Sequence, residues 1–333
     1  MSLALGLDIR KLLRQGGAVL APMAGITDYP MRKLCHQAGA LWCVSEMISA
    51  KAVVYQNPRT WQLARVFSDE GPVALQLFGS DPDVIFQAVE ALQESGAQMF
   101  DLNMGCPTPK IVRNGDGAAL MQNLDLAGEV IAAARAASKL PLMVKMRSGW
   151  DYDQINAPAL AKIAQRRGAD AIAVHPRVRS QMYEGVPDWR VVEEVCREVT
   201  LPVVASGNIH SYDEAAQVMR LTGAEGVMVG RGALGDPWIF TRIRDGFAGQ
   251  QTAPPSIYER IDGARIHLES ALAHGPERVV VAEMRKHIAW YIKGIRGAAA
   301  LRGRVNCCET AASMRLLLSE AAEMAANAQG GLT

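Results

Sequence analysis

The chain has 333 residues, of which 49% are hydrophobic and 21% are charged, so it can bury a sizeable core and is neither disordered nor collagen-like. Its 35 Lys and Arg nearly cancel its 34 Asp and Glu, which leaves a formal charge of +1. This balance argues against a chain that binds nucleic acid along its whole length, but it leaves room for a local basic patch.

Short apolar, β-rich runs alternate with helix-like segments up to about residue 230. The runs are Ala18–Met23, Leu41–Met47, Val73–Phe78, Met99–Asn103, Leu142–Met146, Ala171–His175, Val203–Ser206 and Gly226–Val229. One helix between them, in DPDVIFQAVEALQESGA, has Asp81 placed as its cap and Pro82 at its first position. Strands that alternate with helices pair in parallel, and a set of this size closes a (β/α)8 TIM barrel. An open doubly wound sheet is the alternative, since periodicity does not show closure.

The pattern changes after Gly235. From about Ser256 onward the sequence holds only helical segments, which are IYERIDGARIHLESALAHG, VVVAEMRKHIAWYIKGI and CCETAASMRLLLSEAAEMAANAQ. The stretch TAPPS at 252–256 is typical of a linker. We therefore predict a catalytic barrel over 1–245 and a small all-helical domain over 246–333.

The cysteines and the N-terminal segment indicate the compartment. The six cysteines are scattered and include no Cys-x-x-Cys pair, so the sequence indicates neither a secreted disulfide scaffold nor a zinc ribbon. The segment MSLALGLDIRKLLRQGG places its basic residues after the apolar run, the reverse of a signal peptide. No stretch reaches the roughly 18 apolar residues of a spanning helix. We expect a cytoplasmic monomer with no membrane partner and no metal.

Polar residues and glycines follow most of the predicted strands at the point where each strand ends. In a barrel, functional side chains lie at these ends. The set is Pro22, Met23, Ala24, Glu46, Gln76, Asn103, Cys106, Lys145, Arg147, His175, Ser206, Gly207, Asn208, Gly230 and Arg231. Any one of them could serve the scaffold alone, for example as a strand cap or an ion-pair partner. Together they exceed what a scaffold needs, so we predict a functional site at this end of the barrel.

Glycines after the last two predicted strands favour a phosphate site. GRGALG at 230–235 matches the GxGxxG pattern of dinucleotide sites, but no βαβ unit and no well-placed ribose-binding acid follow it. In a barrel, such glycines after strand eight, together with Ser206-Gly207-Asn208 after strand seven, form a cup of backbone N–H groups. This arrangement indicates a phosphorylated cofactor or substrate.

Cys106 and Lys145 are the strand-end residues with the most distinctive chemistry. Cys106 lies between a Gly and a Pro after strand four. A free thiol is largely protonated at neutral pH and can act as a nucleophile or a proton donor, and the absence of a neighbouring His favours the donor. Lys145 suits the stabilisation of negative charge on a ring such as a reduced flavin. His175 could contact the same cofactor or be a core histidine.

A run without acidic residues lies in the helical tail. Between Arg285 and Arg304 there are six basic residues, and His287, Trp290 and Tyr291 are interleaved with them. A solvated helix face is the simple interpretation, but aromatics within a run of one charge sign favour binding to an RNA backbone. The candidate phosphate contacts are Lys286, Lys293, Arg296, Arg302 and Arg304.

Seven segments carry a family resemblance. They are APMAGITDYPMR, QLFGSDP, DLNMGCPTPKI, KMRSGW, HPRVRSQMYEG, VMVGRGALGDPWIF and KHIAWYIKG. Together they resemble the bacterial tRNA-dihydrouridine synthases, most closely the B-type branch, from about residue 17 to 305. LNMGCP placed between QLFG and KMRSGW is the most specific part, because related flavin barrels share the architecture but not this set.

The resemblance implies an FMN-bound barrel with a C-terminal tRNA domain, in which NADPH reduces the flavin and the flavin reduces the C5–C6 bond of a D-loop uridine. It implies that Cys106 is the general acid and that Asn103 faces both flavin and uracil. The implied cofactor contacts are Pro22, Met23, Ala24, Gln76, Lys145, His175, Ser206, Gly207, Asn208, Gly230 and Arg231. Arg177, Arg179 and Tyr183 match the family's HGRTR-x-Q-x-Y segment near the substrate, and we expect Arg147 on the same side.

The sequence departs from the family pattern at two places. Pro176-Arg177-Val178 stands where members often read GRT, and Ser206-Gly207-Asn208 stands where they often read NGD. Two other functions stay open. One is an FMN barrel that acts on a free pyrimidine or a dihydroorotate-like molecule, and the other is a tRNA-binding protein with no catalytic activity. The sequence does not distinguish NADPH from NADH.

Overall fold

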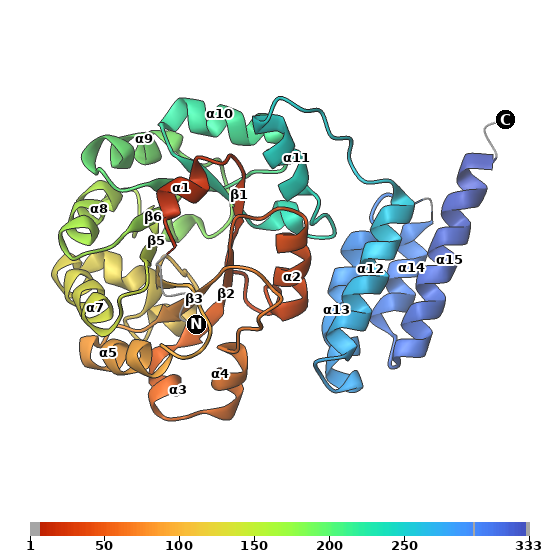
Figure 1. Cartoon of the computed structure of the whole chain (residues 1–333), viewed down its shortest axis with the longest axis horizontal. Helices are drawn as coiled ribbons and strands as arrows, with labels where there is room; N and C mark the ends of the chain where they lie inside the picture. The colour runs from red at the N-terminus through yellow and green to blue at the C-terminus, as the bar shows by residue number, and fades with distance from the viewer. Residues whose placement is uncertain (1–6, 296, 331–333) are drawn as a thin grey trace.

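The computed structural model describes residues 7–295 and 297–330, and within them a parallel sheet closes into a barrel (Figure 1). The strands are β1 (Ala18–Leu20), β2 (Cys43–Ser49), β3 (Val73–Phe78), β4 (Met99–Met104), β5 (Leu142–Gly149), β6 (Ala171–Val178), β7 (Val203–Ser206) and β8 (Gly226–Val229). Each pairs with the next, and β8 pairs with β1 in the register Val19↔Met228. The (β/α)8 barrel is thereby confirmed, and the open sheet is excluded.

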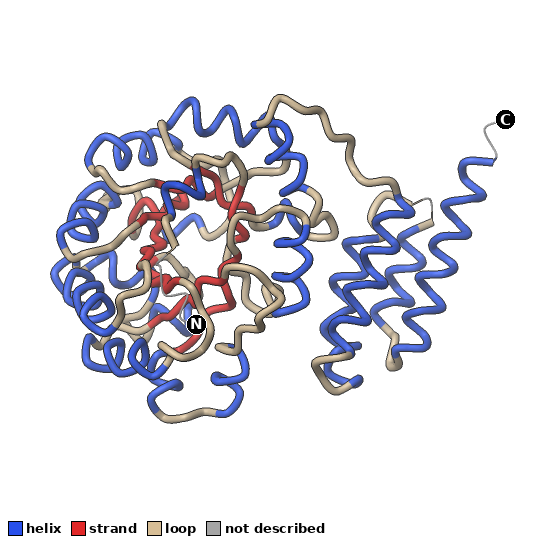
Figure 2. Tube along the Cα trace, viewed as in Figure 1, coloured by secondary structure: helices blue, strands red, loops and turns tan. Residues whose placement is uncertain are grey.

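Helices surround the ring of strands (Figure 2). They are α1 (Ile9–Leu13), α2 (Tyr29–Gln37), α3 (Ala50–Val54), α4 (Pro58–Leu63), α5 (Pro82–Ala91), α6 (Pro109–Val112), α7 (Leu124–Ala137), α8 (Ala157–Arg166), α9 (Trp189–Glu198), α10 (Tyr212–Thr222) and α11 (Ile239–Phe247). Short 3-10 turns lie at Gly117–Gln122, Arg179–Gln181 and Arg231–Ala233. The Asp81 carboxylate accepts from the first backbone N–H groups of α5, as its spacing predicts.

The barrel interior changes from apolar to polar along the strands. Side chains alternate in and out along a strand, so the inward positions of β5 are Met143, Lys145 and Arg147. Met143 belongs to a small buried apolar cluster that also holds Met99 of β4 and Met228 of β8. The polar inward positions follow toward the carboxyl ends. The apolar layer therefore closes one end of the barrel and leaves the other end for chemistry.

The helical domain has its own core. Its helices are α12 (Ile257–Leu272), α13 (Glu277–Tyr291), α14 (Ala298–Asn306) and α15 (Ala311–Gly330). Leu268, Ile288 and Leu318 belong to a buried cluster separate from that of the barrel. Helix α14 was not predicted. Because α11 runs across residue 245 and packs into the barrel core through Phe240, we propose that the domain boundary lies in 248–256.

Direct contacts hold the helical domain against the barrel, where α12 lies beside α2 (Figure 1). The rings of His274 and Tyr29 have centroids 4.5 Å apart. Gly235 has φ +70°, and a Cβ there would lie 2.5 Å from the backbone of Trp290 in α13. A side chain at position 235 would therefore separate the domains. None of the described helices combines the length and the apolar character needed to span a membrane.

Candidate active site

A cavity of about 510 Å³ lies at the carboxyl ends of the strands, within the size range of small-molecule sites. Many of the residues predicted from strand ends line it. They are Pro22, Met23, Ala24, Asn103, Cys106, Lys145, Arg147, His175, Tyr183, Ser206, Gly207, Asn208, Gly230 and Arg231. The structure thus brings together segments that are up to two hundred residues apart in the sequence.

Three further predicted residues lie around this lining. Gln76 is fully buried, and its side-chain amide donates a hydrogen bond to Asp101 and accepts one from Asn103. Arg177 is also buried, and its guanidinium lies 3.0 Å from Nε2 of His175. Arg179 stacks on the Trp150 ring at 4.5 Å. We propose that Gln76 and Arg177 act by positioning the residues that line the cavity.

Several cations surround the cavity, and the lining residues include no Asp or Glu. Burial lowers the pKa of Lys145 to about 8, although the nearby Asp101 opposes this shift. Burial also lowers the pKa of Arg147 to about 10. Lys145 Nζ makes no hydrogen bond or ion pair to any residue that the structure describes. This cationic wall suits an anionic ligand.

His175 is held in its neutral form. Burial lowers its pKa well below the usual value, and Lys145, Arg147 and Arg177 lower it further. Since the Arg177 guanidinium only donates, the His175 Nε2 that it contacts must accept. The proton of the neutral ring therefore lies on Nδ1, so His175 offers one hydrogen-bond donor and no charge.

The loops after β7 and β8 meet in a tight backbone arrangement. A Cβ on Gly207 would lie 2.7 Å from the Trp189 ring, and a Cβ on Gly232 would lie 2.3 Å from a carbonyl oxygen of Ile209. The Asn208 side chain joins the loops by accepting from Arg231 at 3.3 Å. The backbone N–H groups of Gly207 and Asn208 have no partner among the described residues. Free N–H groups next to Arg231 fit a phosphate.

Cys106 is half-buried in the loop after β4. Its Sγ lies 3.3 Å from Thr108 Oγ1 and donates to it. Its backbone N–H donates to Asn103 Oδ1 at 2.8 Å, and Arg147 Nε donates to the carbonyl oxygen of Gly105 at 2.8 Å. No histidine of the described chain forms a hydrogen bond with the thiol. The loop is therefore fixed from two sides, and the sulfur is oriented by a hydroxyl.

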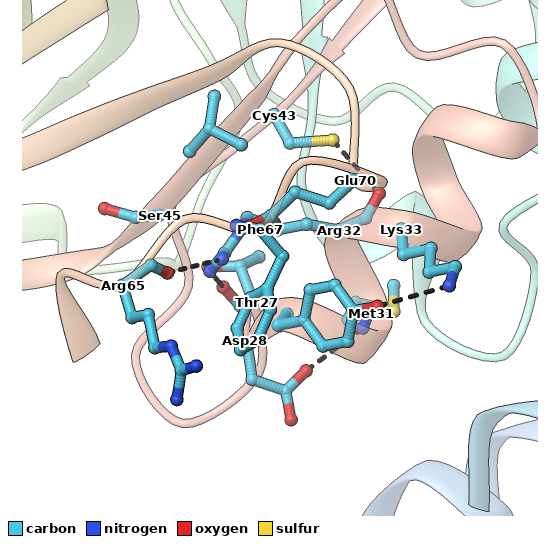
Figure 3. Close-up of polar contacts among 12 residues, drawn as sticks. Thr27, Asp28, Met31, Arg32, Lys33, Cys43, Ser45, Arg65, Phe67 and Glu70 are labelled. Atoms are coloured by element: carbon cyan, nitrogen blue, oxygen red, sulfur yellow. Dashed lines mark hydrogen bonds and ion pairs between the residues drawn. The ribbon is translucent and has the colours of Figure 1, made fainter. Parts of the chain in front are cut away.

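A buried ion pair between Arg32 and Glu70 supports the loop between β1 and α2 (Figure 3). That loop lines the cavity with Pro22, Met23 and Ala24. Arg32 Nε lies 2.6 Å from the Glu70 carboxylate, and both side chains are almost fully buried. The same guanidinium donates to the Thr27 carbonyl oxygen at 2.9 Å. Thr27 Oγ1 in turn accepts from the Met23 N–H at 3.1 Å.

Three functional residues, Asp101, Arg32 and Glu70, were not predicted from the sequence. Asp101 had a signal, because it lies two residues before Asn103 and therefore on the same inward side of β4. Arg32 lies within the APMAGITDYPMR segment, but its partner is 38 residues away in the sequence. No local pattern indicates that pairing.

The structure divides the basic run of the tail. Lys286 Nζ donates to the Gly25 carbonyl oxygen of the barrel, and Arg304 pairs with Glu320 at 2.9 Å. Lys293 and Arg302 are exposed and have no ion pair within the described part of the chain. Arg296 lies outside the described residues.

The interleaved aromatics contribute less to this surface than the sequence suggested. His287 and Tyr291 are buried, because they occupy inward positions of α13 that face His267 of α12. Neither ring is available to stack on a nucleotide base. The basic surface of the tail therefore depends on its exposed cations.

Sequence comparisons with known proteins agree on one family. The chain matches the family described as "Dihydrouridine synthase (Dus)" over residues 19–328. It is 40% identical to a Rickettsia conorii protein named "Probable tRNA-dihydrouridine synthase", over 86% of this chain and 88% of that relative. It is 38% identical to "tRNA-dihydrouridine synthase B" of Xanthomonas axonopodis pv. citri, over 88% of each. Among solved structures, histamine dehydrogenase from Rhizobium sp. 4-9 shares the fold with a TM-score of 0.53 at 12% identity, over 69% of this chain and 45% of that one.

Proposed function

The chain belongs to the dihydrouridine synthase family, and from this premise we propose that it is a tRNA-dihydrouridine synthase. It reduces the C5–C6 bond of a D-loop uridine in tRNA to 5,6-dihydrouridine, with FMN as cofactor, NADPH or NADH as reductant and Cys106 as proton donor. The observation that carries the proposal is the convergence of a thiol, an unpaired ammonium and free backbone N–H groups on one cavity.

The lining residues fit a flavin mononucleotide. We assign the phosphate to the N–H groups of Gly207 and Asn208 with the Arg231 guanidinium. We assign the negative charge of the reduced ring to Lys145, whose ammonium has no competing partner among the described residues. Pro22 and Met23 supply an apolar wall. When bound, the flavin supplies the hydride for the reduction.

Cys106 supplies the proton. Addition of hydride at C6 of uracil leaves the electron pair of the C5–C6 bond at C5 and on O4. The Cys106 S–H bond breaks as the new C5–H bond forms, and water then returns a proton to the thiolate. Without substrate, the thiol donates its hydrogen bond to Thr108 Oγ1, and the bound uracil then takes the place of Thr108 as the acceptor. Arg147 and Tyr183, whose ring the Arg147 guanidinium approaches at 5.5 Å, border the space for the base.

Turnover of tRNA against free pyrimidines tests the proposed substrate. Purified enzyme with NADPH should form dihydrouridine in unmodified tRNA and leave free uracil, uridine and dihydroorotate unchanged, because a single base offers nothing to the helical domain. Mass-spectrometric nucleoside analysis measures both reactions. Turnover of a free pyrimidine without RNA would instead support a metabolic flavin enzyme.

The purified protein is expected to be yellow and to contain one non-covalent FMN. The lining offers one group of free N–H groups next to Arg231, which is enough for a single terminal phosphate. Mass spectrometry of the cofactor released by heat distinguishes FMN from FAD. A folded protein without a flavin absorbance band, or one that releases FAD, would contradict this assignment.

Loss of two exposed cations in the helical domain is expected to weaken tRNA binding. Replacing Lys293 and Arg302 with Ala should lower the affinity and flatten its salt dependence by up to about 1.4–1.8 log units per log unit of salt, at 0.7–0.9 for each phosphate contact. The matched control replaces Lys162 of α8 and Arg197 of α9, exposed cations on the side of the barrel away from the helical domain (Figure 1). If both variants had the same salt slope, Lys293 and Arg302 would not contact the RNA.

A further inference from the structure

Asp101 is a buried carboxylate that has no part in the steps above. It lies fully buried inside the barrel on β4, and its Oδ1 has no hydrogen-bond partner in residues 7–295 and 297–330. Its other oxygen, Oδ2, accepts from Nε2 of Gln76 on β3. A buried carboxylate is costly unless its surroundings use its charge, so its role requires an explanation.

An unbroken line of hydrogen bonds, which we call the amide relay, leads from Asp101 to the Cys106 loop. Gln76 Oε1 accepts from Asn103 Nδ2 at 2.8 Å. Asn103 Oδ1 then accepts from the N–H groups of Cys106 at 2.8 Å and of Gly105 at 3.2 Å. Each amide in the relay uses its donor on one side and its acceptor on the other.

Shape alone does not fix the direction of the amide relay. An Asn or Gln amide that turns by 180° occupies almost the same volume, so only its hydrogen-bond partners decide which way it points. An ionised carboxylate only accepts, which forces Gln76 to turn its NH2 group toward Asp101 and its oxygen toward Asn103. The backbone N–H groups at the other end only donate, so the Asn103 oxygen must face them. The two ends demand the same direction.

We propose that Asp101 is a positioning residue that sets the direction of the amide relay and thereby holds the loop that carries Cys106. The proposal rests on the proposed function only for the catalytic meaning of Cys106. Burial raises the pKa of Asp101 to about 7, while Lys145 on the neighbouring strand opposes this shift. The relay is therefore best examined at a pH of about 8, where the carboxylate is ionised.

The test replaces the carboxylate with an amide. Asp101→Asn offers either a donor or an acceptor to Gln76, so only the backbone N–H groups at the other end still favour the original direction. We expect hydrogen–deuterium exchange of the Gly105–Cys106 segment and iodoacetamide alkylation of Cys106 each to become at least about fivefold faster, the lower bound for a lost buried hydrogen bond. Peptide mass spectrometry reads both rates at one site. Asp170→Asn, at the opposite end of the barrel, is the control and should leave both rates unchanged.

A second variant separates the amide relay from general loosening. Gln76→Met interrupts the relay without changing a charge and should accelerate the same two rates. If Asp101 acts through Gln76, adding Asp101→Asn to Gln76→Met does not change the two rates further. If the two substitutions acted independently, their fold-increases in rate would multiply. Wild-type rates in folded Asp101→Asn protein, or multiplying effects in the double variant, overturn the proposal. If Asp101→Asn does not fold, unchanged rates in Gln76→Met are enough to overturn the proposal.

These measurements are independent of the substrate. Exchange and alkylation are followed in the protein as purified, without RNA or reductant. An enzyme that fails to reduce tRNA would refute the proposed function and leave the amide relay standing. Conversely, unchanged loop dynamics in an active enzyme would refute the relay alone.

Discussion

The Cys106→Ala variant is expected to retain its flavin and its affinity for tRNA and to lose dihydrouridine formation by about 10²–10⁴-fold, the usual contribution of a positioned general acid. We expect this loss because Cys106 is the only cysteine among the described lining residues and an Ala side chain has no proton to donate. Nucleoside mass spectrometry in single-turnover reactions measures the rate.

The oxidation of NADPH distinguishes this role from a structural one. Transfer of hydride to the flavin needs no proton at C5 of uracil, so the rate of flavin reduction should be nearly the same in Cys106→Ala and the wild type. Cys307→Ala, which changes an exposed cysteine of the helical domain, is the matched control for thiol loss. If Cys106→Ala formed dihydrouridine at the wild-type rate, the thiol would not be the proton donor.

Glu70→Gln is expected to lower the free energy of unfolding of the barrel by about 3–5 kcal/mol, the cost of leaving one member of a buried ion pair without its partner. The Arg32 guanidinium would keep its charge in a place where its side chain is only 3% exposed. Because the same guanidinium holds the Thr27 carbonyl, and Thr27 holds Met23, the variant should also release flavin more readily. Urea unfolding followed by circular dichroism, together with flavin content after dialysis, measures the two effects.

Two comparisons make this result specific. Glu193→Gln breaks the exposed pair with Arg197 on the outer surface of α9 and should change stability little. The double variant Arg32→Met and Glu70→Leu replaces the pair with apolar side chains and should recover most of the lost stability. Flavin retention need not recover with it, since no donor then reaches Thr27. A Glu70→Gln protein as stable as the wild type would mean that the guanidinium finds another partner.

The strands were predictable because each is a short apolar run between helices. β3, β7 and β8 have the bounds that the sequence indicates, whereas β1 ends at Leu20 because the chain leaves the sheet to line the cavity. β5 and β6 extend to Gly149 and Val178, since polar residues continue the pairing beyond the apolar run. Helix α14 was missed because it begins directly after Gly297 and contains Gly303, two signals that normally end helices.

The cavity lining was predictable for a geometric reason, while its support was not. Parallel strands bring their carboxyl ends to one rim, so a list of strand-end residues is also a list of neighbours. The residues that hold the lining loops in place make contacts between segments that are distant in the sequence, such as the pair of Arg32 and Glu70. The helical domain gives a second example. Lys286 Nζ donates to the Gly25 carbonyl oxygen of the barrel, and no pattern of charge in the sequence predicts that contact.

The pairing of the first strand with the last has a consequence for biosynthesis. β1 reaches its second neighbour only when Val227–Val229 have been made, because Val19 pairs with Met228. At about 5–20 residues per second, the nascent chain keeps an unsealed sheet edge for roughly 10–50 seconds. The unpaired edge of β1 is apolar, which favours pairing with other chains, but β1 has only three residues, and a short edge limits such pairing. The helical domain follows β8 in the sequence, so it is made only after every strand of the barrel.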